Sequence, residues 1–356
     1  MYVTSIKETP RPMVTLEEIA ERAGVTTKTV SNVLRGHYKA GRSDAARRAR
    51  DIRVLAESMG YRVNAAARAT RTGRTGLVGM VSSFEFAFSV HVPAFEQGLM
   101  QRLYEQGSCL VKDLIDEQPD GSISHLPRII REGVVDGVLI NYAFGTPPMI
   151  RDALERWRIP AIWINRKRDA NCVRPDDTGA GYEATMHLIR HGHRRIRYSD
   201  GPDTHQRAHM EHYSRQDRQD GYTRAMTESG LQPTFCKSSA DSPPKRHAGH
   251  LFDHCVSELK RPESATAYVC NGHGRTLVAA AMALGRRVPQ DVCVVDIDND
   301  ASAGDQLRID RLIVPHLSMG RAAAEELLQL IQQPQTPRRP IVLPFGFEPM
   351  GTVAVR

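Results

Sequence analysis

The hydrophobic pattern of this 356-residue chain changes at Leu77, and this change limits the fold more than any other feature. Before Leu77, apolar residues recur at helical spacing; after it, short apolar runs alternate with amphipathic segments. We interpret the runs as buried parallel strands at residues 77–81, 109–111, 134–140, 161–164, 196–198, 267–270 and 292–297. The pattern predicts an α/β doubly wound body, long enough for one enzyme or for two stacked lobes with a cleft.

The excess positive charge lies on the N-terminal side of the same boundary. Residues 1–75 contain 15 Lys and Arg but 7 Asp and Glu, a balance of +8, whereas residues 76–356 contain 33 and 34. A basic module joined to a nearly neutral body predicts that the N-terminal module binds a polyanion.

Residues 15–34 carry the signals of two short helices joined by a tight turn. Thr15 and Glu18 have the spacing of a capping box, which predicts the start of the first helix. Gly24 supplies the positive φ that the turn requires, and Thr26 is placed to cap the second helix.

The second helix is predicted to have one apolar and one polar face. Val30, Val33 and Leu34 face inward, and the outward positions are Thr27, Lys28, Thr29, Ser31, Asn32 and Arg35. This is the helix-turn-helix arrangement, in which the second helix enters the major groove of DNA. A third helix from about Ser43, with Ile52, Leu55, Ala56 and Met59 on one face, is expected to close the small core.

Residues 15–34 resemble the lactose/galactose-repressor (LacI/GalR) family of bacterial transcription regulators at nearly every position. The resemblance covers nearly the whole chain. Its further landmarks are residues 135–138, 159–161, 187–196, 288–292 and 319–321. It favours two stacked lobes over a single enzyme body.

The resemblance implies an all-α helix-turn-helix DNA-binding domain at residues 1–60 and a hinge at 61–75. Residues 76–356 would form a two-lobed, periplasmic-binding-protein-like body of parallel sheets that binds an effector and dimerises. A homodimer would bind double-stranded, pseudo-palindromic operator DNA, and a small effector, a sugar or sugar derivative, would control operator affinity. Repression is the favoured outcome, and induction and co-repression by the effector fit the sequence equally.

The same resemblance assigns the DNA contacts. Thr27, Lys28 and Asn32 would read base edges, since Asn pairs with adenine and Lys with guanine. Phosphate contacts would come from Thr15, Thr26, Thr29 and Ser31. Hinge contacts would come from Tyr61, Asn64 and Arg68, unless residues 61–75 are a plain flexible linker. Val63 and Thr70 replace the family's usual Pro and Leu, so we expect a weaker kink in the operator.

The effector contacts are also implied by the resemblance. They fall on Ser83, His91, Asn165, Arg218, Asn271, Asp298 and His316. Ligands in such folds bind at the carboxyl ends of the strands. Arg218 and Asp298 are the main candidates, because Arg donates to sugar hydroxyls and Asp accepts from them; the alternative for both is an ion pair between the lobes.

Other chemistry has weaker support in the sequence. The histidines at 187, 191 and 193 and those at 205, 209 and 212 lack a nearby Cys or a firm carboxylate geometry, so we expect no metal. Gly272 and Gly274 have the spacing of a dinucleotide loop, but Leu277 occupies the third glycine position, so we expect no cofactor. Two other classes, a solute-binding protein of transport and a sugar-acting enzyme with a DNA-binding head, stay as alternatives to a non-enzymatic regulator.

The chain has no run of 18 apolar residues, and its start has no apolar stretch of signal-peptide length. We therefore expect a cytoplasmic protein without a membrane partner. The six cysteines lie far apart without a Cys-x-x-Cys pair, which predicts small buried thiols and no disulfide framework.

Overall fold

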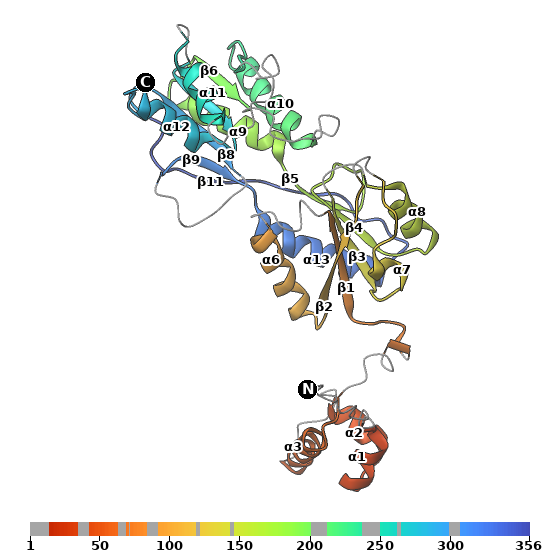
Figure 1. The fold of residues 1–356 in the computed structure, drawn as a ribbon. Helices are drawn as coiled ribbons and strands as arrows, with labels where there is room; N and C mark the ends of the chain where they lie inside the picture. The colour runs from red at the N-terminus through yellow and green to blue at the C-terminus, as the bar shows by residue number, and fades with distance from the viewer. Residues whose placement is uncertain are drawn as a thin grey trace, which may run out of the picture. The chain divides into compact units, whose positions relative to one another are not determined.

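The computed structural model describes residues 14–34, 43–62, 69–70, 72–83, 92–118, 122–142, 146–200, 212–236, 250–261, 265–298 and 307–356. The chain divides into two compact units, Met1–Thr75 and Gly76–Arg356 (Figure 1). Among the predicted site residues, Asn64, Arg68 and His91 lie outside the described residues.

The N-terminal unit contains α1 (Leu16–Ala23), α2 (Thr27–Leu34) and α3 (Ser43–Ser58). The predicted capping box is confirmed: Thr15 Oγ1 accepts from Glu18 N at 3.3 Å, and Glu18 Oε2 accepts from Thr15 N at 2.8 Å. Gly24 ends α1 with φ 62°, and Thr26 Oγ1 accepts from Thr29 N in the first turn of α2. The turn between the helices therefore forms as its residues predict.

The helices of this unit depend on a shared core. Helices as short as α1 and α2, eight residues each, are marginal in isolation. The buried residues of the core are Ile19, Ala20, Val30, Val33, Ala49, Ile52 and Ala56. Leu55 and Met59 of the predicted third helix pack against it, as expected.

The body contains two sheets. The first, all parallel, has the order β10-β5-β4-β3-β1-β2. Its strands are β1 (Leu77–Ser83), β2 (Cys109–Ile115), β3 (Gly137–Asn141), β4 (Ala161–Ile164), β5 (Cys172–Pro175) and β10 (Ile341–Leu343). The second has the order β11-β9-β8-β7-β6, with only β11 antiparallel. Its strands are β6 (Ile196–Ser199), β7 (Ala267–Asn271), β8 (Cys293–Asp298), β9 (Asp310–Ile313) and β11 (Gly346–Glu348).

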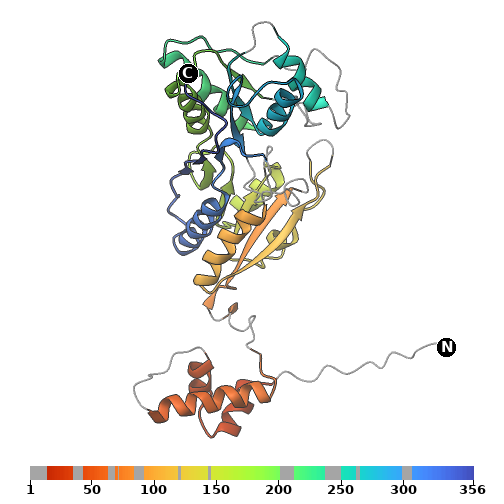
Figure 2. The same cartoon turned by 90° about the vertical axis from the view of Figure 1, so that its left-hand side faces the viewer.

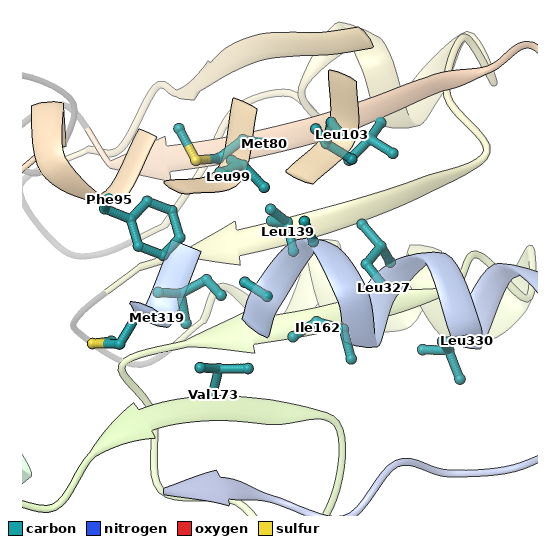
Figure 3. Close-up of a cluster of buried hydrophobic side chains, with 14 of the residues drawn as sticks. Met80, Phe95, Leu99, Leu103, Leu139, Ile162, Val173, Met319, Leu327 and Leu330 are labelled. Carbon is teal, nitrogen blue, oxygen red and sulfur yellow. The ribbon is translucent and has the colours of Figure 1, made fainter. Parts of the chain in front are cut away.

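The first sheet and its helices form the N-terminal lobe. Helices α6 (Val92–Glu105) and α13 (His316–Gln332) cover one face, and α7 (Arg128–Arg131) and α8 (Pro148–Arg156) cover the other. Successive strand residues alternate between the two cores: Ile162 packs toward α13, and Trp163 packs toward α8. Figure 3 shows Leu139 and Ile162 of the sheet beside Leu327 of α13.

The second sheet and its helices form the C-terminal lobe (Figure 2). Helices α9 (Asp177–Arg190) and α10 (Tyr213–Glu228) pack on one face, and α11 (His250–Leu259) and α12 (Gly274–Ala283) on the other. Each lobe is thus a three-layer α/β sandwich. The predicted fold class, a helix-turn-helix unit with a two-lobed body of parallel sheets, is confirmed.

The chain passes between the lobes three times, from β5 to α9, from β9 to α13 and from β10 to β11. The N–H of Asp176 in the first passage donates to the carbonyl O of Leu343, the residue of β10 from which the third passage starts, at 2.8 Å. Phe345, also in the third passage, packs against the cores of both lobes. The lobes therefore meet through adjacent, hydrogen-bonded passages.

Two expectations about burial were wrong. Strand β2 was expected to be buried, but it lies at the edge of its sheet and most of its residues are partly or fully exposed. Its Cys109 is exposed and Cys236 is partly exposed, whereas the other four cysteines are buried as predicted. Within the described residues, no helix has both the length and the apolar character needed to span a membrane.

Candidate effector site and DNA-binding surface

The predicted recognition residues lie along α2. Thr27 and Lys28 are exposed, and Ser31 and Asn32 are partly exposed on the same short helix. The hydroxyls of Thr26 and Thr29 lie 3.0 Å apart at the start of α2, and Thr15 holds the start of α1. The helix therefore presents hydroxyl, amide and ammonium groups of the kind that contact bases and phosphates.

Tyr61 has a different environment. Its ring packs against the core of the N-terminal unit, and its N–H donates to the carbonyl O of Ala56 at 2.9 Å. In this structure it closes the end of α3.

In the C-terminal lobe, three polar residues lie at the carboxyl ends of neighbouring strands. Asp200 follows β6, Asn271 ends β7 and Asp298 ends β8. Because β6, β7 and β8 are adjacent and parallel, these ends meet at one edge of the sheet. This is the edge where α/β folds bind ligands.

Arg218 of α10 joins this edge through a buried network. The side chain is only 5% exposed; its Nε donates to Asp177 Oδ1 at 2.8 Å, and its Nη1 donates to Asn271 Oδ1 at 2.6 Å. Asn271 Nδ2 in turn donates to Asp200 Oδ1 at 2.6 Å, and Arg215 forms an ion pair with Asp200. The predicted residues Arg218 and Asn271 thus contact each other directly.

Two glycines bring α10 close to α9. A Cβ atom at Gly181 would lie 1.9 Å from the carbonyl O of Arg218, and one at Gly221 would lie 2.0 Å from that of Thr178. Only glycine permits such an approach of two backbones. The crossing places Arg218 beside Asp177 at the start of α9.

Asp177 was not predicted as a site residue. In the structure it is fully buried. Burial raises the pKa of its carboxyl group, while the neighbouring Arg218 guanidinium lowers it. Its Oδ2 atom has no hydrogen-bond partner among the described residues. The adjacent acids Asp176 and Asp177 are visible in the sequence, but their relation to Arg218 is a tertiary one.

Asp298 is buried and forms ion pairs with Arg275 at 3.0 Å and with Arg311 at 3.7 Å. Both arginines belong to the C-terminal lobe, as Asp177 does for Arg218. These ion pairs therefore lie within one lobe and do not link the two lobes.

The loop at Gly272 and Gly274, whose glycine spacing resembled a dinucleotide site, is hydrogen-bonded to the sheet. Asp296 accepts from the N–H groups of Gly272 and Gly274, both at 2.9 Å. Burial raises the pKa of Asp296 to about 7, and the nearby Asp298 carboxylate adds to the effect. The two N–H groups that could cradle a phosphate are already occupied by this side chain.

In the N-terminal lobe, Ser83 ends β1 and Asn165 follows β4. Ser83 is 3% exposed, and its Oγ has no hydrogen-bond partner among the described residues. Asn165 has a positive φ of 53°, and its Oδ1 accepts from Tyr213 of α10 at 3.0 Å. Its carbonyl O lies 3.1 Å from Nε2 of His212, which therefore donates.

Asn165 thus connects the two lobes at the start of α10. Burial lowers the pKa of His212 to about 4, so the ring is neutral at pH 7. Lys167, in the loop after β4, forms a second link with Asp217 at 2.8 Å. His316, the first residue of α13, lies on the passage from β9.

No group of three or more His, Cys, Asp or Glu side chains in the described parts of the chain could hold a metal ion. His187 Nε2 lies 3.2 Å from Asp310 Oδ2, and His193 Nε2 donates to the carbonyl O of Ala354 at 3.1 Å. His205 and His209 lie outside the described residues.

A helix-turn-helix unit, together with a two-lobed body that carries polar strand ends, defines the class of DNA-binding regulators with a ligand-binding body. Comparison with known proteins agrees with this class. The family model of the periplasmic binding protein-like domain matches residues 185–351.

Relatives and solved structures extend the match to most of the chain. The HTH-type transcriptional regulator AglR of Rhizobium meliloti (strain 1021) is 30% identical over 288 residues, 76% of this chain and 75% of the relative. The maltose regulon regulatory protein MalI of Escherichia coli (strain K12) is 26% identical over 93% of this chain and 96% of its own. The lac repressor dimer bound to operator and the anti-inducer ONPF superimposes with a TM-score of 0.71 at 19% identity, covering 96% of this chain and 100% of its own.

A complex of the regulator CelR with cellobiose has a TM-score of 0.59 at 24% identity, and covers 96% of this chain and 100% of its own. The chain belongs to the LacI/GalR family of transcriptional regulators, as the resemblance predicted. It is a DNA-binding regulator of transcription, and the relatives named here are regulators, not enzymes.

Proposed function

We propose that this regulator binds a pseudo-palindromic operator as a homodimer in the cytoplasm, and that a sugar or sugar derivative at the strand ends of the body controls its operator affinity. The observation that carries the proposal is the buried network in which Arg218 contacts Asp177 and Asn271 at the carboxyl ends of the strands. Arginine and carboxylate groups held rigidly at this edge suit the hydroxyl groups of a polyol. The bound cellobiose of the CelR complex agrees with this ligand class.

The three passages between the lobes provide the coupling. An effector that binds one arrangement of the lobes more tightly than another shifts their populations, and operator affinity follows. The sign of the coupling stays open, because either arrangement could be the one that favours the operator. The proposal therefore covers both induction and co-repression.

On the DNA side, we assign base reading to Thr27, Lys28 and Asn32, and phosphate contacts to Thr15, Thr26, Thr29 and Ser31. The hinge contacts are assigned to Tyr61, Asn64 and Arg68.

The base-reading residues can be tested by substitution. Lys28→Ala and Asn32→Ala should each relax base preference at defined operator positions, with a loss of about 1–3 kcal/mol of binding free energy for the preferred base. Arg71→Ala should instead weaken binding evenly across sequences and lower the salt dependence by about one contact. Equal losses on all sequences from the first two variants would contradict base reading.

Ser83 offers a mild test of the effector side, because its buried hydroxyl has no partner among the described residues to lose. We expect cellobiose, maltose or ribose to raise the melting temperature of the wild type. Ser83→Ala should lower the affinity for that sugar about 5–10-fold. Ser257→Ala, at an exposed position of α11, is the matched control and should bind as the wild type does. The effector assignment fails if no sugar of a broad panel changes either melting temperature or operator affinity.

A further inference from the structure

Four polar residues form a row across the carboxyl edge of the first sheet. The strand register pairs Ser82 with Asn141, Asn141 with Ile164, and Ile164 with Val173. One residue further along each chain segment are Ser83, Tyr142, Asn165 and Arg174. Side chains two residues apart on a strand share a face. Ser83, Tyr142 and Arg174 therefore lie on the face of Val81, Ile140 and Cys172, which belong to one core cluster, whereas Asn165 follows β4 with a positive φ.

The effector assignment does not include Tyr142 and Arg174 of this row; Tyr142 is a fully buried member of the core, whereas Arg174 is only partly buried. Its guanidinium forms no hydrogen bond or ion pair with any described residue, and its Nε atom is shielded from solvent without a partner. A buried donor left unpaired costs about 1–3 kcal/mol. Such groups are rare in native structures and call for a physical reason.

An unpaired acceptor stands three residues further along the chain from this unpaired donor. Asp177 offers one oxygen to Arg218, and its other oxygen, Oδ2, is buried without a partner among the described residues. Burial raises the pKa of Asp177, and Arg218 and, more weakly, Arg174 lower it, so the Arg174 charge acts on this carboxylate. The two groups nevertheless form no direct ion pair. Tyr213 of α10, which donates to Asn165 of the row, also lies within the electrostatic influence of both.

A hydroxyl group accepts from an N–H donor and is neutral, so it can pair with Arg174 without adding charge near Asp177. A phosphate or carboxylate of a ligand could accept from Arg174, but it would place a second negative charge beside Asp177, which disfavours it. Resting on the proposed function, we infer that Arg174 is an effector-contact residue, and that its guanidinium donates to a hydroxyl of a neutral sugar. Arg174 then makes the site select neutral sugars over anionic derivatives.

The test uses the full-length protein with six probes: cellobiose, maltose, ribose, glucose, gluconate and glucose 6-phosphate. Wild type, Arg174→Met and Arg174→Gln are compared by melting temperature and by titration calorimetry. The matched control is Arg151→Met, at an exposed position of α8. We expect Arg174→Met to lower the affinity for the tightest-binding neutral probe by about 10–100-fold, as for the loss of a charge-assisted hydrogen bond. Arg151→Met should leave that affinity unchanged.

A second readout needs no ligand. Because Arg174 has no hydrogen-bond or ion-pair partner among the described residues to lose, Arg174→Met and Arg174→Gln should melt close to the wild-type temperature without sugar. A clear loss of stability in both would show that Arg174 is a structural residue and would overturn the inference.

The outcomes separate the inference from the proposed function. In one outcome, Ser83→Ala weakens the binding of a neutral probe, but Arg174→Met changes its dissociation constant by less than twofold. This result overturns the role of Arg174 and keeps the effector site. Tighter binding of gluconate or glucose 6-phosphate than of glucose, lost in Arg174→Met, overturns the hydroxyl assignment in favour of an anionic ligand. If none of the six probes binds, both the sugar effector and the inference are contradicted.

Discussion

The two lobes of the body share one packing plan. In each, a pair of helices crosses at two glycines: Gly98 and Gly320 between α6 and α13, and Gly181 and Gly221 between α9 and α10. A Cβ atom at Gly98 or Gly320 would lie 2.0 Å from a carbonyl O of the facing helix, much as in the C-terminal pair. The backbone framework is thus nearly the same in both halves.

Their charges differ. In the C-terminal lobe, the ion pair of Arg218 and Asp177 is almost completely buried, and Asp298 is buried between two arginines. In the N-terminal lobe, ion pairs such as Arg102–Glu325 are partly exposed, and the strand ends carry the neutral Ser83 and Asn165 beside the charged residue Arg174. Similar packing therefore supports a buried charged network at the strand ends of one lobe and a more neutral set of strand ends in the other.

The largest expected effect is the difference in stability lost when a buried ion pair and a partly exposed ion pair are each broken. Arg218→Met leaves Asp177 buried without its partner and should lower the free energy of unfolding by about 3–5 kcal/mol. Arg102→Met, in the N-terminal lobe, should lower it by less than about 1 kcal/mol, because its pair is solvated. Urea unfolding of the full chain measures both.

The double variant Arg218→Met with Asp177→Leu is the control, since replacing both charges by apolar groups removes the unpaired carboxylate. It should recover most of the lost stability. If it is no more stable than Arg218→Met alone, the buried charge of Asp177 is not the cause.

The next effect tests whether the packing plan is shared. Gly98→Ala and Gly181→Ala should each destabilise the body by about 1–3 kcal/mol or more, because a methyl group would press on a backbone carbonyl in both lobes. Gly346→Ala is the control, since no atom lies within 4 Å of the position that its methyl group would take, and it should unfold as the wild type does. Tolerance of the substitution in one lobe only would break the equivalence of the two crossings.

These contrasts also explain how far the sequence leads. The capping box at Thr15, the positive φ of Gly24 and seven of the strands are local signals, and the structure confirms them. Strands β5, β9, β10 and β11 were not predicted. Charged residues interrupt the apolar run in β5, β9 and β11, and β10 has only three residues; all four form because neighbouring strands pair with them. The contacts of Arg218 with Asp177 and Asn271 join residues 41 and 53 positions apart, which no local pattern encodes.

A third prediction concerns pH. His273 of the C-terminal lobe is 5% exposed, and burial lowers its pKa to about 4, so the folded state favours the neutral ring. The unfolded state takes up the proton first as the pH falls below about 6.5. The stability is therefore complete above that value and is lost toward pH 4, by about 2 kcal/mol between pH 7 and pH 5.

His273→Gln should flatten this pH dependence. It should also lower the free energy of unfolding at pH 7, because the 2.8 Å hydrogen bond between His273 Nε2 and Ser199 Oγ is lost. His212, whose pKa burial also lowers to about 4, should keep part of the slope. Unfolding free energies of both proteins at pH 7 and pH 5 measure the difference. An unchanged slope would show that His273 does not titrate in this range.

The smallest expected effect lies between the lobes. Lys167 is 57% exposed, whereas its partner Asp217 is 7% exposed, so solvent screens much of the pair even though it joins the two lobes. Lys167→Met should change the free energy of unfolding by about 0.2–1 kcal/mol, and the difference should shrink as salt is raised. A loss as large as that of Arg218→Met, or one that salt does not reduce, would mean that charge between the lobes matters as much as charge buried within one of them. A small, salt-sensitive loss instead fits lobes that are each rigid and are joined weakly enough for an effector to shift them.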